Sequence, residues 1–333
     1  MRGGVDVLSR TSDWETMTDA PLHTLLGAGG SVGTALAREL VARGTRVRLV
    51  SRRGVQEPGT ESRRADLTRQ EETVEAVRGS SVVYQVVGLP YRASVWAEQW
   101  PAVMSNTIEA CKRAGAALVF LDNVYMYGRV DGPMTEETPY NPCSRKGEVR
   151  ARIARQLQEE MKSGSVRACI ARAADFYGPH AERTAVPHVL ALDRLMAGKG
   201  AQWLVDASLP HSLGFTLDSA RGMALLGERP EALGQVWHLP ASDPPIDGRT
   251  FVELAAKEIG VPPRLSPLKP WMVRLAGLFN SDVAETTEML YQYEREYRFD
   301  STKITGAFGI TPTPYPEGIR ETVAWLKAYR RPS

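Results

Sequence analysis

The chain has 333 residues, of which 43% are hydrophobic and 24% charged, enough for two domains or one large α/β unit. A formal net charge of +2 without a long basic run argues against nucleic acid as a partner, and no apolar run is long enough to predict membrane association. The cysteines Cys111, Cys143 and Cys169 and the five histidines lack metal-ligand spacing. We therefore expect no metal site and a reducing, cytoplasmic environment.

Residues 1–20 read as a polar leader without the apolar segment of a signal peptide, and we expect them to be disordered. Met17 lies five residues before the first predicted strand. We hypothesise that Met17 is the native start.

A strand, a glycine-rich turn and a helix open the folded part of the chain. The strand is predicted at Leu22–Leu26, the turn has the sequence GAGGSVG, and residues 34–43 have helical periodicity. Glycine permits positive φ and lets a pyrophosphate approach the backbone, while the helix N-terminus offers free N–H groups and a positive dipole end. The turn therefore predicts dinucleotide binding, and the alternative is a purely structural turn. The predicted contacts are Gly27, Gly30, Ser31, Val32 and Gly33.

The second predicted strand, Thr45–Val50, ends at a position that distinguishes the two nicotinamide dinucleotides. An Asp or Glu there would bind the ribose 2′-hydroxyl of NAD, but the chain has Ser51, Arg52 and Arg53. A hydroxyl and two guanidinium groups suit a 2′-phosphate. The sequence therefore favours NADP(H), with NAD(H) as the alternative cofactor and a solvated basic loop as the alternative interpretation.

The rest of the first half alternates strands and helices. Strands are predicted at Ser62–Leu67, Ser81–Val87, Ala116–Leu121 and Val166–Ala171, and helices at Gln70–Arg78, Ser94–Ala114 (interrupted near Pro101) and Arg145–Lys162. This alternation predicts an α/β fold with a doubly wound, parallel Rossmann-type sheet, whose ligands bind at the carboxyl ends of the strands. Asp66, Leu67, Val87 and Gly88 fall at these ends and are predicted to contact the cofactor.

The second half has frequent prolines and shorter elements. Helices are predicted at residues 186–196, 217–226, 250–259, 271–278, 284–293 and 317–329. We therefore predict an NADP-binding Rossmann domain over residues 21–178. A smaller, mostly helical substrate lobe is expected over residues 179–333, intertwined with the last strands of the sheet.

Several motifs occur in a fixed order along residues 22–326. They include GAGGSVG at 27–33, VYMYG at 124–128, ARAADFYGP at 171–179, FTLD at 215–218 and FDSTKITGAFGITPTPYPEGIRETVAWL at 299–326. In this order the chain resembles the extended short-chain dehydrogenase/reductase family, the NAD(P)-dependent epimerase/dehydratase group. The resemblance implies an NAD(P)-dependent oxidoreductase or epimerase that acts on a small molecule. Family members often dimerise, which makes a homodimer possible.

The family catalyses with a Ser or Thr, a Tyr and a Lys, and the chain departs from that set. The resemblance places Asn123, Lys146 and Arg150 at the three positions. Lys146 and Arg150 share a helix face, so a like charge would disfavour the ammonium form of Lys146 and let it give or take a proton beside the cofactor. Asn123 would donate its amide N–H to a substrate oxygen, and Arg150 would hold the nicotinamide ribose.

Two other interpretations of these residues stay open. Lys146 and Arg150 could form a solvated basic face on a fold that only binds nucleotide. Alternatively another residue supplies the proton. The candidates are Tyr125, Tyr127, Tyr177 and His180, among which Tyr127 is expected to be a packing residue and Tyr125 is favoured.

The residues expected around the substrate also differ from the family pattern. Sugar-nucleotide members place an Arg where this chain has His211, and His is a weaker anion partner. We therefore favour a smaller or more apolar substrate than a nucleotide sugar. Trp96, Trp100 and Met104 could line its pocket, although helix core is the favoured interpretation.

Three functions are compatible with these patterns. The first is an NADP(H)-dependent oxidoreductase or epimerase acting on a carbonyl, hydroxyl or enone of a small metabolite. The second is a catalytically silent NADP(H)-binding sensor or partner-binding protein. The third is a lyase or cyclase on the same fold.

Overall fold

The computed structural model describes residues 20–181 and 185–329. The predictions for the leader and for Met17 lie outside the described residues. Among the described helices, none is long and apolar enough to cross a membrane.

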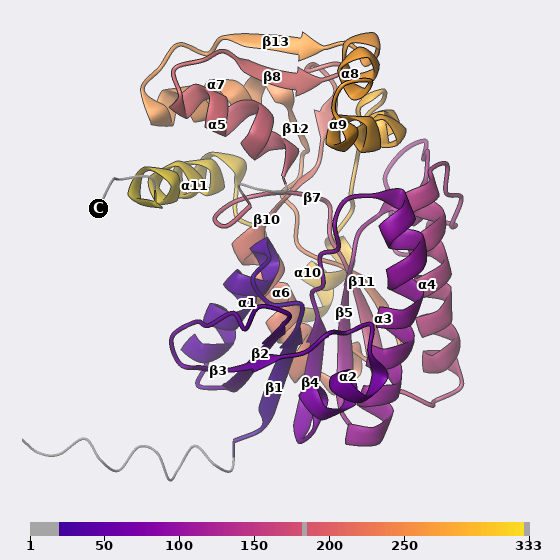
Figure 1. Cartoon of the computed structure of the whole chain (residues 1–333). Coiled ribbons are helices and arrows are strands. Elements are labelled where there is room, and N and C mark those ends of the chain that lie inside the picture. The colour runs from indigo at the N-terminus through magenta and orange to yellow at the C-terminus, as the bar shows by residue number, and fades with distance from the viewer. Residues whose placement is uncertain (1–19, 182–184, 330–333) are drawn as a thin grey trace, which may run out of the picture.

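A seven-stranded sheet forms the centre of the molecule, in the order β11-β6-β5-β4-β1-β2-β3. Each strand pairs in parallel with its neighbours, which confirms the predicted doubly wound parallel fold (Figure 1). The strands are β1 (Leu22–Leu26), β2 (Arg46–Ser51), β3 (Thr60–Arg64), β4 (Ser80–Gln85), β5 (Ala117–Asp122), β6 (Ala168–Arg172) and β11 (Val236–His238).

Helices cover both faces of this sheet. Helices α1 (Ser31–Ala42) and α6 (Thr216–Glu228) pack on one face, and α2 (Gln70–Val77), α3 (Ala93–Ala114) and α4 (Arg145–Lys162) pack on the other. Neighbouring residues of one strand serve opposite faces, because Leu25 packs with α1 whereas Leu26 packs with α3. Burial on both faces explains why the strands read as apolar runs. These elements are called the sheet domain below.

A second group of elements, called the lobe below, lies across the carboxyl ends of the strands (Figure 1). Its helices are η2 (His188–Leu192), α5 (Asp193–Met196), α7 (Gly248–Ile259), α8 (Pro270–Gly277), α9 (Ser281–Thr286), η4 (Thr287–Tyr293) and α11 (Tyr315–Tyr329). Three two-stranded ladders pair β7 (Asp175–Tyr177) with β10 (Leu213–Phe215), β8 (Ala201–Leu204) with β13 (Leu265–Leu268), and β9 (Pro210–His211) with β12 (Ile246–Asp247). The lobe thus contains strands that the helical periodicity did not predict, because two to four residues are too few to show alternation.

The chain returns from the lobe to the sheet domain twice. Helix α6 and strand β11 complete the sheet domain, and α10 (Thr302–Phe308) then packs beside β11. The domain boundary at residue 178 stays a prediction. Although α6, β11 and α10 come after this boundary in the chain, they pack with the sheet domain.

Some predicted element bounds need correction. Helix α3 runs unbroken through Pro101, and the apolar side chains on its buried face pack on the sheet. Strand β3 ends at Arg64, so Asp66 lies in the following loop. The helix predicted at residues 284–293 is instead α9, capped by the Asn280 side chain, followed by the 3₁₀ helix η4.

Candidate functional site

The glycine turn after β1 has the backbone that its sequence predicts. Gly27 and Gly29 have φ of +88° and +96°, where residues with a Cβ are strained. A Cβ on Gly27 would lie 2.5 Å from Cα of Val87, and a Cβ on Gly33 would lie 3.1 Å from a methyl of Val86. The glycines therefore let the turn and α1 pack directly against the segment that follows β4. This brings the predicted cofactor contact Val87 next to the turn.

The N-terminus of α1 is suited to an anion. Gly30 is the N-cap residue, no side chain caps the helix, and its first turn contains no acidic residue. A Cβ on Gly30 would meet no atom of the described residues within 4 Å, so there is open space beside Gly30, which precedes the first-turn residues Ser31, Val32 and Gly33. The backbone N–H groups at a helix N-terminus, the helix dipole and the open space beside Gly30 fit the pyrophosphate of a dinucleotide.

The end of β2 presents two arginines to solvent. The Ser51 hydroxyl accepts hydrogen bonds from the N–H groups of Gly54 and Val55, both at 3.0 Å, and so holds the turn in place. Arg52 and Arg53 are exposed, and neither forms an ion pair with a carboxylate of residues 20–181 or 185–329. Their guanidinium groups are available for a phosphate.

Residues after β3 and β4 complete the edge that the cofactor was predicted to use. Asp66 accepts hydrogen bonds from the N–H and hydroxyl of Thr68, which lower the pKa of its carboxyl. The carbonyl of Leu67 accepts from the Asn106 amide, and Gly88 is exposed. Asp66 is thus ionised at neutral pH and ordered by its own turn.

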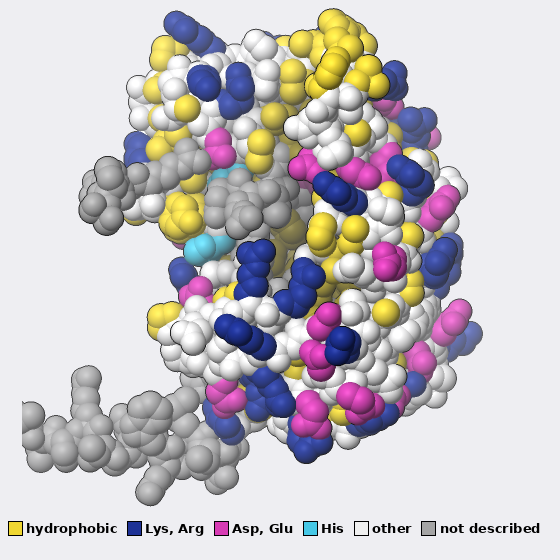
Figure 2. All heavy atoms as spheres, viewed as in Figure 1, with side chains coloured by type: hydrophobic (Ala, Val, Ile, Leu, Met, Phe, Trp, Pro, Cys, Tyr) yellow, Lys and Arg dark blue, Asp and Glu magenta, His cyan; other side chains and the backbone are white. Residues whose placement is uncertain are grey.

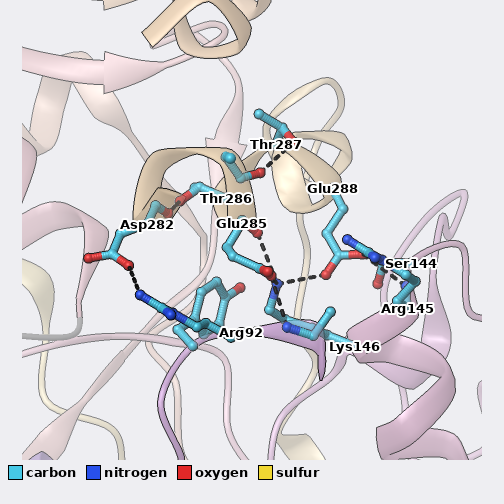
Figure 3. Close-up of polar contacts among 12 residues, drawn as sticks. Arg92, Ser144, Arg145, Lys146, Asp282, Glu285, Thr286, Thr287 and Glu288 are labelled. Atoms are coloured by element: carbon cyan, nitrogen blue, oxygen red, sulfur yellow. Dashed lines mark hydrogen bonds and ion pairs between the residues drawn. The ribbon is translucent and has the colours of Figure 1, made fainter. Parts of the chain in front are cut away.

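Lys146 lies at the N-terminus of α4 and bridges the sheet domain to the lobe (Figure 3). Its ammonium donates to Glu285 Oε2 at 2.5 Å, to Glu288 Oε1 at 2.7 Å and to the Glu285 carbonyl at 3.0 Å. The side chain is fully buried, and its Nζ lies 4.5 Å from the centroid of the Tyr91 ring. These contacts replace the like-charge environment that the sequence predicted, because Arg150 pairs elsewhere.

Arg150 is buried in an ion pair with Asp122, the last residue of β5. Its Nε lies 2.8 Å from Asp122 Oδ1, and its guanidinium stacks 4.4 Å from the Trp100 ring centroid. The other oxygen of Asp122 lies 3.5 Å from Arg172 Nε. Arg150 therefore contributes to a buried network, and its predicted contact with a ribose stays a prediction.

Asn123 and Tyr125 follow β5 at the carboxyl edge of the sheet. The Asn123 side-chain oxygen accepts from the Tyr125 N–H at 3.1 Å, which fixes the start of the 3₁₀ helix η1 (Tyr125–Tyr127). The Tyr125 hydroxyl accepts a hydrogen bond from the Tyr91 hydroxyl at 3.3 Å, and its ring stacks on Trp96. Burial raises the pKa of Tyr125, so the phenol is protonated at neutral pH.

The other tyrosine and histidine candidates have structural contacts. The Tyr127 hydroxyl accepts from Arg172 and lies 2.8 Å from His238 Nε2. Tyr177 is buried in the core of the lobe, and His180 contacts Arg38 and the Trp325 ring. Trp96, Trp100 and Met104 lie in the core under α3.

Next to the carboxyl edge of the sheet, the lobe places the carboxylate of Asp175 among aromatic side chains. Asp175 Oδ2 accepts from His211 Nε2 at 3.0 Å and from the Tyr293 hydroxyl at 2.9 Å. The His211 imidazole is stacked between the rings of Tyr293 and Tyr297, with centroids 4.5 and 4.2 Å away. Figure 2 shows the surface hollowed between the lobe and the sheet domain, and we call this hollow the groove.

Sequence reasoning missed four of the acidic residues described above. Asp122 is the last residue of β5 and Asp175 comes shortly after β6, and both are positions at strand ends where polar residues could have been noted. Glu285 and Glu288 gave no local signal, because their partner Lys146 lies about 140 residues earlier in the chain.

Comparison with known proteins finds one family model and one similar protein that covers most of the chain. The sequence model of the NAD dependent epimerase/dehydratase family matches residues 24–239. The protein y4nL of Sinorhizobium fredii, described as uncharacterized, is 25% identical over 351 residues, which cover 92% of this chain and 95% of that protein.

Solved structures show the same fold. The crystal structure of gox2253 superposes with a TM-score of 0.77 at 22% identity and covers 93% of this chain and 99% of its own. MoeE5 in complex with UDP-glucose and NAD gives a TM-score of 0.76 at 20% identity, over 93% and 99% of the two chains.

Proposed function

The chain belongs to the NAD dependent epimerase/dehydratase family, and on this premise we propose that it is an NADP(H)-dependent oxidoreductase or epimerase. Its substrate is a small metabolite with a carbonyl or hydroxyl group. The observation that carries the proposal is the open N-terminus of α1 behind Gly30, which fits a dinucleotide pyrophosphate. MoeE5, whose structure was solved in complex with UDP-glucose and NAD, has the same fold. A cytoplasmic location and a homodimer are part of the proposal.

The preference for NADP(H) rests on Arg52 and Arg53. Both guanidinium groups are exposed at the end of β2, and no residue of β2 is acidic. Two cations without a carboxylate partner in the described residues favour a ribose 2′-phosphate over a 2′-hydroxyl.

For proton transfer we assign the acid to Tyr125. A bound nicotinamide dinucleotide supplies or accepts the hydride. When the carbonyl carbon gains a hydride, its oxygen gains negative charge and needs one proton, and the protonated phenol of Tyr125 gives it. Tyr91, which is 38% exposed and donates a hydrogen bond to Tyr125, then returns a proton to Tyr125 and takes one from solvent. Oxidation runs these transfers in reverse.

Asn123 and Lys146 have supporting roles in this proposal. The Asn123 amide N–H₂ forms no hydrogen bond within the described part of the chain and would donate to the substrate oxygen. The ammonium of Lys146 donates three hydrogen bonds, all to Glu285 and Glu288. Its role is therefore to hold the lobe and the ring of Tyr91 in place. Proton transfer by Lys146, predicted from the sequence, is the competing assignment.

Turnover of NADPH with a panel of small aldehydes and ketones tests the proposal. We expect Tyr125→Phe to lower kcat at least 100-fold while NADPH affinity stays within twofold. Tyr329→Phe, at an exposed tyrosine of α11, is the matched control. If Lys146→Met is folded and inactive while Tyr125→Phe is active, the assignment of the acid to Tyr125 is wrong. NADPH binding without turnover of any carbonyl would favour the catalytically silent protein.

A further inference from the structure

The strongest unassigned feature is the carboxylate of Asp175. It lies at the start of β7, directly across from η4 of the lobe, and its side chain is 20% exposed. Within the described residues its carboxylate accepts two hydrogen bonds, from His211 and Tyr293, and both go to the same oxygen, Oδ2. Within the described residues no Lys or Arg forms an ion pair with Asp175. One oxygen of a partly exposed carboxylate is therefore open to a ligand.

Aromatic groups surround this carboxylate. Burial is the main reason why the pKa values of Tyr125, Tyr293 and Tyr297 are raised, and the negative charge of Asp175 is the second reason. The hydroxyl of Tyr297 is buried and makes no well-formed hydrogen bond in the part of the chain that the structure describes. Tyrosine ring faces carry partial negative charge, so they favour cations and offer nothing to a phosphate.

The neighbouring lobe helices α9 and η4 also carry negatively charged side chains. Lys146 is the buried cation that faces both Glu285 and Glu288, and the exposed guanidinium of Arg145 lies 3.8 Å from Glu288. With Asp175, three carboxylates stand against one buried ammonium and one exposed guanidinium. Figure 2 shows acidic side chains on the lobe side of the groove. A diphosphate placed here would meet uncompensated negative charge.

We propose that Asp175 and the surrounding tyrosines form a specificity subsite that accepts a protonated amine of the substrate and excludes phosphate. The inference rests on the proposed function and narrows its substrate to an amine-bearing carbonyl or alcohol rather than a nucleotide sugar. The amine donates to the free oxygen of Asp175 and lies against a tyrosine ring. Asp175 thus sets specificity and takes no part in proton transfer.

Ligand titrations with the NADPH-saturated protein test this subsite. Benzylamine and benzyl alcohol have the same shape and differ in charge, and we expect wild-type protein to bind the amine at least tenfold more tightly. Asp175→Asn should abolish that preference and increase affinity for UDP-glucose at least tenfold. Asp206→Asn, which removes one exposed carboxylate after β8, should behave as wild type.

The outcomes separate this inference from the proposed function. Wild-type protein that does not prefer benzylamine, or that binds UDP-glucose as tightly as Asp175→Asn does, overturns the subsite. Should Asp175→Asn fail to fold, the wild-type comparison of amine with alcohol still decides. Failure of wild-type protein to bind NADPH in the preliminary titration would instead overturn the proposed function.

Discussion

The ammonium nitrogen of Lys146 lies 2.7 Å from Oε1 of Glu288, and the two residues are 142 positions apart in the chain. The same glutamate accepts the N–H of Arg145, the first residue of α4, at 2.9 Å. Glu285 accepts the N–H of Ala93, the first residue of α3, also at 2.9 Å. Two lobe carboxylates thus cap two helices of the sheet domain, and Lys146 joins them.

Lys146→Met should destabilise the protein by about 2–4 kcal/mol, because it removes the buried cation that two largely buried carboxylates share. Urea unfolding followed by circular dichroism measures this change. Lys112→Met is the matched control, since Lys112 pairs with Glu160 at 2.7 Å but both side chains are about 30% exposed. The control should cost less than about 1 kcal/mol. Equal losses in the two variants would mean that Lys146 does not join the lobe to the sheet domain.

Stability should depend on pH through Glu285. Burial opposes ionisation of this carboxyl, but hydrogen bonds from Lys146 and the Ala93 N–H outweigh it and hold its pKa below the usual 4.5. A lowered folded pKa gives a contribution that is complete above about pH 4.5 and is lost as pH falls through the folded pKa. The difference in unfolding free energy between wild type and Glu285→Gln should therefore shrink from pH 7 to pH 3.5. A difference that is constant over this range would contradict the ion pair.

More of the fold than of the candidate site could be predicted from the sequence. Apolar runs such as Leu22–Leu26 and the turn Gly27–Gly33 carry their structure locally, through burial and through positive φ. The partners of Lys146 are not local. The segment that contains Glu285 and Glu288 has a helical pattern, and nothing in it indicates that it packs on α4.

The buried ion pairs of Asp122 with Arg150 and Arg172 could not be predicted from the local sequence either. Lys146 and Arg150 do share α4, as their spacing predicts, but Arg150 turns to Asp122 and Lys146 to the lobe. Only the sheet order, which brings the ends of β5 and β6 together, places Asp122 between Arg150 and Arg172. Tertiary structure thus gives each cation its own carboxylate, which the spacing on α4 does not reveal, and proton transfer by Lys146 stays a prediction.

Arg52→Ala combined with Arg53→Ala should separate the two cofactors. Loss of charge-assisted contacts with the 2′-phosphate should weaken NADPH binding at least tenfold and leave NADH binding within twofold, as measured by titration of cofactor fluorescence. Arg78→Ala provides the control, because Arg78 is an exposed arginine that pairs with Glu75. Equal losses of NADPH and NADH, or none, would remove the basis for the NADP(H) preference.

Gly30→Ala should affect the cofactor and leave the fold intact. Gly30 has φ −86° and ψ 173°, which alanine adopts freely, and its new Cβ would meet no atom of residues 20–181 or 185–329 within 4 Å. The methyl would instead occupy the space in front of α1 that we assign to the pyrophosphate. NADPH affinity should therefore fall at least tenfold, while the free energy of unfolding changes by less than about 0.5 kcal/mol.

Two other glycines calibrate this result. Gly306 lies in α10, and a Cβ added there would meet no atom of the described residues within 4 Å. Gly306→Ala should leave cofactor affinity unchanged and alter the free energy of unfolding by no more than about 1 kcal/mol. Gly27→Ala combines φ +88° with a contact of 2.5 Å to Val87 and should lose stability as well as affinity. Unchanged NADPH binding in a folded Gly30→Ala protein would show that the open end of α1 does not hold the cofactor. In that case the observation that carries the proposed function would no longer support it.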